Sequence, residues 1–289
     1  MRVRFWGVRG GIAATRQDAQ GIGGNTPCVE LRDRDGHLLI LDAGIGLYWL
    51  GRSLLAGPLG RGKGEATILL THSHWDHIQG FPFFVPAFIP GNRIDIWGGG
   101  VATLRDVLEG QMSGTYSPID GMANMGASIE VGDLSQCPVL ERGRFRITHA
   151  HYRNGPHDMV GYRIEEDGKS LCYISEADHR AGLDPTIVEL ARGVDVLVHE
   201  AFYTDEELAA GGNSLAGPSG PPSGGHCSFG QATEVAIAAG AQRLHYFYHH
   251  PDHSDADIHA AVAREREKIA ARGLPLRVEP AREGLEFQV

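Results

Sequence analysis

The chain has 289 residues, of which 42% are hydrophobic, which is enough for one large α/β domain with a sizeable core. Its formal net charge of −10 argues against non-specific nucleic-acid binding, which depends on Lys and Arg neutralising phosphates. A phosphate-containing substrate is not excluded, because bound divalent cations can dominate the local field of a site. We expect a single domain over residues 1–289.

The four cysteines are scattered and form no Cys-x-x-Cys pair, which indicates a reduced, cytoplasmic protein rather than a disulfide scaffold. The first residues enter a strand-like alternation at once, so we expect no signal peptide. No stretch approaches the roughly 20 apolar residues that a membrane span needs.

Apolar alternation and short β-branched runs predict strands in both halves of the chain. In the first half the predicted elements are, in order, strands 3–8, 28–31 and 37–42, helix 50–55, strands 66–70 and 93–97, helix 102–111 and strand 129–131. In the second half they are strands 144–151, 159–165 and 170–175, helix 185–192, strand 194–199, helix 231–239, strand 243–248, helix 255–272 and a strand-like end at 276–289. This pattern predicts an α/β fold in which two mixed sheets pack together with helices outside, a four-layer αβ/βα sandwich. Residues 204–225 are rich in Gly, Ser and Pro and predict a long, flexible loop.

Three histidines and one aspartate lie within six residues directly after the predicted strand 66–70: His72, His74, Asp76 and His77. On an extended backbone alternate side chains share a face, so His72 and His74 can converge on one ion. Neutral imidazole and carboxylate suit zinc, and also manganese or iron. A polar loop that is rich in His is the alternative, but four potential ligands at H-x-H-x-D-H spacing after a buried strand favour a metal site.

The His72-x-His74-x-Asp76-His77 pattern resembles the signature of the metallo-β-lactamase superfamily. Four further stretches are similar to a phosphodiesterase-like branch near ribonuclease Z and the cyclic phosphodiesterase of phosphonate breakdown, at residues 5–10, 23–26, 41–44 and 77–84. The resemblance implies a metallo-β-lactamase-type sandwich and hydrolysis by a metal-bound hydroxide. It also implies two divalent metal ions as cofactors, with Zn²⁺ favoured and Mn²⁺ or Fe as alternatives.

The resemblance implies further ligands later in the chain. The third histidine of the first ion is expected at His151, with His149 and His157 as alternatives. The carboxylate that bridges the two ions is expected at Glu176, where related chains have Asp, with Asp178 as the alternative.

The resemblance also implies a last metal-binding histidine directly after the predicted strand 243–248. His249 fits this position and His250 is the alternative. An ungapped match to the family pattern would place Tyr248 there. Asp42 ends its own strand near the metal stretch, where it could hold the tautomer of a ligand histidine or cap the following turn. The expected metal ligands are therefore His72, His74, Asp76, His77, His151, Glu176 and His249.

Two further pieces are similar to ribonuclease Z, residues 197–202 and 225–228. They imply that His226, assisted by Glu200, protonates the leaving group, while Asp76 orients the attacking hydroxide. The structural alternatives are a salt-bridged strand end for Glu200 and a plain loop residue for His226.

These residues predict a metal-dependent phosphodiesterase that acts on a small or cyclic nucleotide or on a short nucleic-acid end. We expect a small-molecule phosphodiester as the partner, with no membrane and no large nucleic-acid surface, and leave a homodimer open. The alternatives are a hydrolase of a lactone, thioester or β-lactam on the same scaffold, and a non-hydrolytic metal protein of a cofactor pathway, as relatives linked to pyrroloquinoline quinone suggest.

Overall fold

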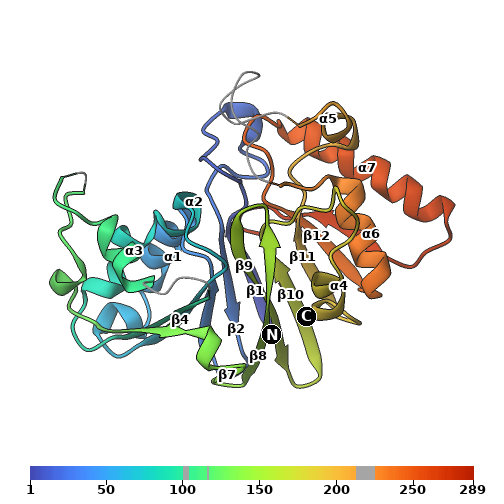
Figure 1. Ribbon diagram of the computed structural model, residues 1–289. Coiled ribbons are helices and arrows are strands. Elements are labelled where there is room, and N and C mark those ends of the chain that lie inside the picture. Colours follow the sequence, from blue (N-terminus) through green and yellow to red (C-terminus); the bar gives the residue numbers. More distant parts are fainter. Residues whose placement is uncertain (100–103, 116, 213–224) are drawn as a thin grey trace.

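The computed structural model describes residues 1–99, 104–115, 117–212 and 225–289. They form two seven-stranded sheets that pack against each other, with helices on both outer sides (Figure 1). The layers therefore follow the order helices, sheet, sheet, helices, which confirms the predicted four-layer αβ/βα sandwich. No helix within the described ranges is long and apolar enough to cross a membrane.

The first sheet is antiparallel at one edge and parallel toward the other. The turn at residues 33–36 joins two of its antiparallel strands, and the Asp33 carboxylate accepts hydrogen bonds from the backbone N–H groups of Asp35 and His37 there. In spatial order the strands are β14 (Glu286–Gln288), β1 (Arg2–Gly7), β2 (Cys28–Arg32), β3 (Leu38–Leu41), β4 (Glu65–Leu70), β5 (Arg93–Gly98) and β6 (Ser128–Asp133).

The second sheet has the same mixed character, antiparallel in its first half and parallel in its second. In spatial order its strands are β7 (Val139–Arg142), β8 (Phe145–Asn154), β9 (His157–Glu166), β10 (Lys169–Ile174), β11 (Val196–Glu200), β12 (Arg243–Phe247) and β13 (Arg277–Pro280).

The helices are α1 (Gly46–Leu54), α2 (Trp75–Ile78), α3 (Leu104–Gly110), α4 (Pro185–Leu190), α5 (Asp205–Ala209), α6 (Phe229–Ala239) and α7 (Asp255–Ala271). Helices α6 and α7 begin with capping boxes at Ser228 and Ser254, which satisfy N–H groups that the helix itself leaves unpaired. The loop predicted at 204–225 contains the short helix α5, and its residues 213–224 lie outside the described part of the chain.

The strand β3 shows how the layers are held together. Leu39 and Leu41 lie in the core between the two sheets, whereas Leu38 and Ile40 lie in a second core with α1. A strand that is buried on both faces reads as a continuous apolar run rather than as an alternation. The apolar run at this strand is therefore a consequence of its place between two layers.

Candidate metal centre

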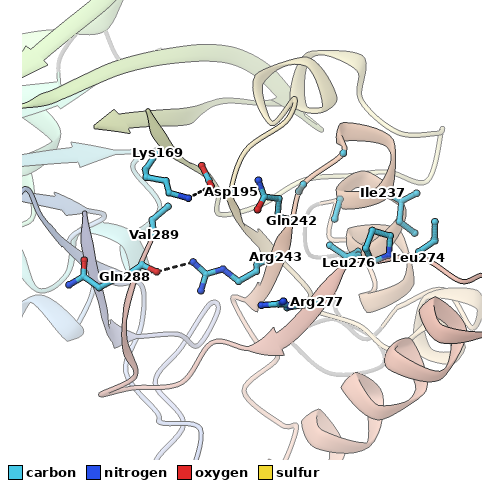
Figure 2. A pocket seen from close by; sticks show the side chains of 14 residues that line it. Lys169, Asp195, Ile237, Gln242, Arg243, Leu274, Leu276, Arg277, Gln288 and Val289 are labelled. Atoms are coloured by element: carbon cyan, nitrogen blue, oxygen red, sulfur yellow. Dashed lines mark hydrogen bonds and ion pairs between the residues drawn. The ribbon is translucent and has the colours of Figure 1, made fainter. Parts of the chain in front are cut away.

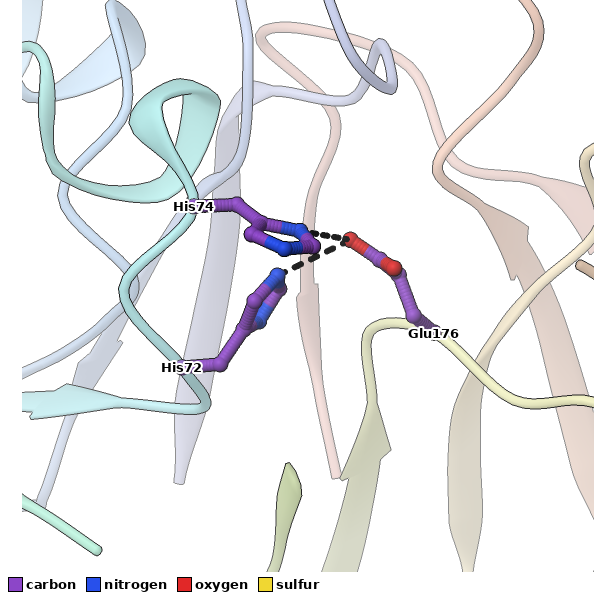
Figure 3. Close-up of side chains that lie close together, drawn as sticks. All are labelled: His72, His74 and Glu176. Atoms are coloured by element: carbon purple, nitrogen blue, oxygen red, sulfur yellow. Dashed lines mark ion pairs between the residues drawn. The ribbon is translucent and has the colours of Figure 1, made fainter. Parts of the chain in front are cut away.

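The first group of potential ligands lies at the ends of β4 and β10. His72 and His74 follow β4, and Glu176 follows β10 by two residues. Figure 3 shows both imidazoles pointing at the Glu176 carboxylate, with His72 Nε2 3.1 Å and His74 Nδ1 4.0 Å from Glu176 Oε1. Two imidazoles and one carboxylate at this spacing can hold one divalent ion.

A second group shares the same glutamate. His77 Nε2 lies 3.2 Å from Asp76 Oδ2 and 3.2 Å from Glu176 Oε1. Glu176 therefore belongs to both groups and lies where a bridging carboxylate is needed. The alternative bridge, Asp178, is instead held by Arg180, whose guanidinium lies 2.6 Å from its carboxylate.

Two imidazole nitrogens in these groups, His72 Nε2 and His77 Nε2, face the carboxylates across the space where a cation would bind. His77 Nδ1 lies 2.9 Å from the Asp42 carboxylate, the contact expected of Asp42, so its N–H points there and its Nε2 lone pair faces Asp76 and Glu176. The buried His72 Nε2 makes no hydrogen bond, although its Nδ1 lies 3.1 Å from Thr71 Oγ1. Both nitrogens thus present a lone pair to the space between the carboxylates, which fits a divalent ion.

The pKa values of His74 and Asp76 keep these two residues in the forms that bind metal. Burial lowers the pKa of His74 to about 4, which leaves that imidazole neutral. Burial alone would raise the pKa of Asp76, but the adjacent His77 outweighs it and lowers the pKa to about 2. Neutral imidazole and ionised carboxylate are the states a metal requires at neutral pH. Burial would lower the pKa of His77, but the Asp76 and Asp42 carboxylates outweigh it and raise this pKa, so a metal would displace a proton from His77.

The structure does not bring His151 to this cluster. The strand predicted to end at His151 continues to Asn154, because β8 and β9 pair along their whole length, and His151 lies exposed opposite Val160. The tip of this hairpin brings a different histidine to the site, since the ring of His157 lies 4.5 Å from that of His74. His157, one of the two alternatives to His151, is thus better placed to bind the ion of His72 and His74.

The other alternative at this position, His149, is placed away from the cluster as well. Its Nε2 lies 2.9 Å from the backbone oxygen of Cys137.

His249 also lies outside the cluster. Its Nε2 donates a hydrogen bond to the Ala281 carbonyl at 3.1 Å, on the other side of the chain. The residue that reaches the cluster is Tyr248, whose hydroxyl lies 2.6 Å from Asp76 Oδ2 and whose ring stacks on His77. The alternative, His250, packs on the Phe202 ring instead. The ungapped match to the family pattern, which places Tyr248 at the ligand position, therefore agrees with the structure better than the assignment of His249.

The predicted proton donor His226 and its partner Glu200 contact each other beside the cluster. Glu200 ends β11, and its carboxylate contacts His226 Nδ1 through one oxygen and accepts the Ala177 N–H at 2.6 Å through the other. Burial would lower the pKa of His226, but the Glu200 carboxylate outweighs it and raises the pKa to about 9. His226 is therefore protonated at neutral pH, with Nδ1 held by Glu200 and Nε2 left as the nitrogen that can give a proton away.

A separate cavity of about 620 Å³ lies at the opposite end of β12, where the strand begins (Figure 2). Its lining includes an ion pair between Lys169 and Asp195 and the Arg243 side chain, which donates to the Gln288 carbonyl at 2.9 Å. None of the residues of the two donor groups lines it.

The fold and the donor cluster together define an α/β-sandwich protein with a candidate metal centre at its strand ends. Residues 37–256 match the model of the β-lactamase superfamily domain, and the chain therefore belongs to this superfamily.

Ribonuclease BN of Cronobacter sakazakii (strain ATCC BAA-894) is 26% identical over 294 residues, which cover 84% of this chain and 87% of the relative. Several solved structures are similar across the whole chain, among them a diphosphatase and a zinc-bound protein. A diphosphatase of the PhnP family superposes with a TM-score of 0.65 at 16% identity, covering 100% of this chain and 97% of its own. Zinc-bound PqqB of Methylobacterium extorquens also gives a TM-score of 0.65 at 16% identity, covering 100% of both chains. These two likenesses show the fold alone.

Proposed function

We propose that this protein is a metal-dependent phosphodiesterase that acts on a small or cyclic nucleotide or on a short nucleic-acid end. The observation that carries the proposal is the Glu176 carboxylate, one oxygen of which faces two separate groups of metal ligands. Two cations that share one carboxylate would suit the in-line displacement of a phosphoester. The zinc in the similar PqqB structure supports zinc as the ion.

His72, His74 and Glu176 would hold one ion, and Asp76, His77 and Glu176 the other. When bound, such ions supply Lewis-acid activation of water and neutralise the charge on phosphoryl oxygens. The chain's own part is to hold these groups in place. Gly11 N–H donates to Asp76 Oδ2 at 3.0 Å, so this carboxylate is fixed where it can accept a hydrogen bond from the attacking water.

His226 is the proposed general acid. Its Nε2 would donate a proton to the departing oxygen, and the Glu200 carboxylate would stabilise the imidazolium before that transfer. A phosphodiester of a nucleotide needs this help, because its leaving group is an alkoxide. A thioester makes less use of it, because a thiolate can leave without a proton, and the pair therefore favours phosphodiesters over thioesters.

The proposed substrate is small. The net charge of −10 offers little to a long phosphate backbone. The similar fold of a diphosphatase supports a small substrate, whereas the ribonuclease relative supports RNA. The assay therefore includes both small nucleotides and RNA ends. Cytoplasmic location and a small-molecule partner stay predictions.

The test compares two leaving groups in wild type and in His226→Ala. Wild type should hydrolyse bis(p-nitrophenyl) phosphate and a 2′,3′- or 3′,5′-cyclic nucleotide only with divalent metal present. The variant should lose about 10²- to 10⁴-fold in kcat/KM on the nucleotide, and much less on bis(p-nitrophenyl) phosphate, because p-nitrophenolate leaves without a proton. The surface histidine variant His259→Ala is the control and should match wild type.

Absence of metal-dependent turnover on every phosphodiester, RNA ends included, would refute the proposal. Turnover of a lactone or thioester that is untouched by His226→Ala would instead support a carboxylic-ester hydrolase.

A further inference from the structure

Tyr248, and not the expected ligand His249, reaches the cluster from the end of β12. Its backbone φ of +56° lies in the left-handed region, which residues other than glycine rarely adopt. The backbone of the next residue is fixed, because His249 N–H donates to the Val8 carbonyl and Gly10 N–H donates to the His249 carbonyl. This turn directs the Tyr248 side chain into the cluster and the His249 side chain away from it.

The surroundings of the Tyr248 ring allow it little movement. The ring stacks on His77 with centroids 5.3 Å apart and faces His226 at 5.8 Å. A Cβ on Gly10 would lie 2.4 Å from two atoms of the ring, so a glycine is required at that position. Strained backbone that is held this firmly is typical of functional sites.

The hydroxyl of Tyr248 acts on one oxygen of the second ligand group. It donates to Asp76 Oδ2 at 2.6 Å, and it accepts the Gly11 N–H at 3.1 Å. Asp76 Oδ2 is also the oxygen that lies 3.2 Å from His77 Nε2. The Tyr248 hydroxyl therefore occupies a lone pair of Asp76 Oδ2 that the second ion would use. An imidazole in place of the phenol would instead offer that ion a further ligand.

The first ligand group has no such competitor. His72 Nε2 makes no hydrogen bond, and the His157 ring lies 4.5 Å from the ring of His74 as a further imidazole. The two groups thus differ in what surrounds them, although each offers three donor atoms and both share Glu176.

We propose that Tyr248 makes the two cation positions unequal, so that the position of His72 and His74 retains its ion while the position of Asp76 and His77 exchanges its ion readily. The inference rests on the proposed metal centre but not on the identity of the substrate. Tyr248 is in this view a positioning residue, which acts on the second ion through Asp76.

The experiment measures metal content rather than activity. Zinc-loaded wild type is passed over a desalting column in the presence of a weak chelator, and retained zinc is counted by mass spectrometry. We expect about one ion per chain in wild type and about two in Tyr248→His, with the second ion released at least about tenfold more slowly than in wild type. Tyr248→Phe, which frees Asp76 Oδ2 from the hydroxyl but adds no ligand, should release the second ion more slowly than wild type and faster than Tyr248→His.

A second pair of variants tests the same inference if Tyr248→His does not fold. Asp76→Asn should keep the retained ion, whereas His72→Gln should lose it. Two equally retained ions in wild type, or loss of the ion in Asp76→Asn but not in His72→Gln, would overturn the inference and leave the hydrolase proposal standing. A wild-type chain that binds no zinc in either position would overturn both.

Discussion

His77 Nδ1 lies 2.9 Å from Asp42 Oδ2, and both side chains are fully buried. The same carboxylate also accepts hydrogen bonds from the Thr71 N–H and from the Tyr173 hydroxyl. A buried carboxylate with this many partners fixes the orientation of the imidazole, and such partners raise the metal affinity of the histidine they hold.

Asp42→Asn should therefore weaken metal binding at the position of Asp76 and His77 by about 10- to 100-fold. It should also lower the free energy of unfolding by about 1–3 kcal/mol, because the partners of the carboxylate lose a charged acceptor. Zinc titration and urea unfolding measure the two effects. Tyr173→Phe is the control, since it removes one hydrogen bond to the same carboxylate and should leave metal affinity nearly unchanged. Wild-type affinity in Asp42→Asn would contradict this role.

Glu176→Gln should weaken metal binding at both positions, because both ligand groups use the same carboxylate oxygen. Asp178→Asn is the matched control, since Asp178 is paired with Arg180 and should not affect metal content. The comparison is read by mass spectrometry of the metal. The assignment of the bridge to Glu176 fails if the Asp178 variant loses the metal and the Glu176 variant keeps it.

The pH dependence of the proposed reaction should report His226. Its pKa is raised from the ordinary 6.5 to about 9, so the proton needed for catalysis is present below that value and is lost as the pH rises through it. Nearby cations oppose this shift, so the alkaline limb of kcat/KM should lie at or below about pH 9. Glu200→Gln should move the limb to lower pH, since a neutral amide stabilises the imidazolium less. An alkaline limb that is the same in both proteins would rule out the pair as the acid.

Gly10→Ala should disturb the centre from outside the ligand groups. The added Cβ would lie 2.4 Å from the buried Tyr248 ring, which stacks on His77 and cannot move without cost. We expect a loss of about 1–3 kcal/mol in the free energy of unfolding. Gly110→Ala is the control, because a Cβ there meets no atom within 4 Å, and it should be neutral or slightly stabilising. Equal stability of the two variants in thermal unfolding would show that the Tyr248 ring is free to move.

Much of the fold follows from local patterns. The apolar runs and turn residues predict most strands and the longer helices, because strands that are buried on both faces leave a clear signal in the sequence. The cluster from His72 to His77 is predictable for the same reason, since its spacing and the preceding strand are both local.

The distant ligands depend on tertiary structure that the sequence does not display. His151 was expected at a strand end, but the end of β8 is set by its pairing with β9, which carries the strand to Asn154 and brings His157 to the tip. The side chain of Tyr248 enters the site because its backbone is left-handed, a conformation that tyrosine rarely adopts and that no spacing rule predicts.

The most direct test of the account is a crystal of the zinc-loaded protein and its anomalous-difference map at the zinc edge. We predict a strong peak between His72 Nε2, His74 Nδ1 and Glu176 Oε1, and a weaker peak between Asp76, His77 and the same glutamate oxygen. A map without a peak at Glu176, or with its peak at His151 or His249, would contradict the account.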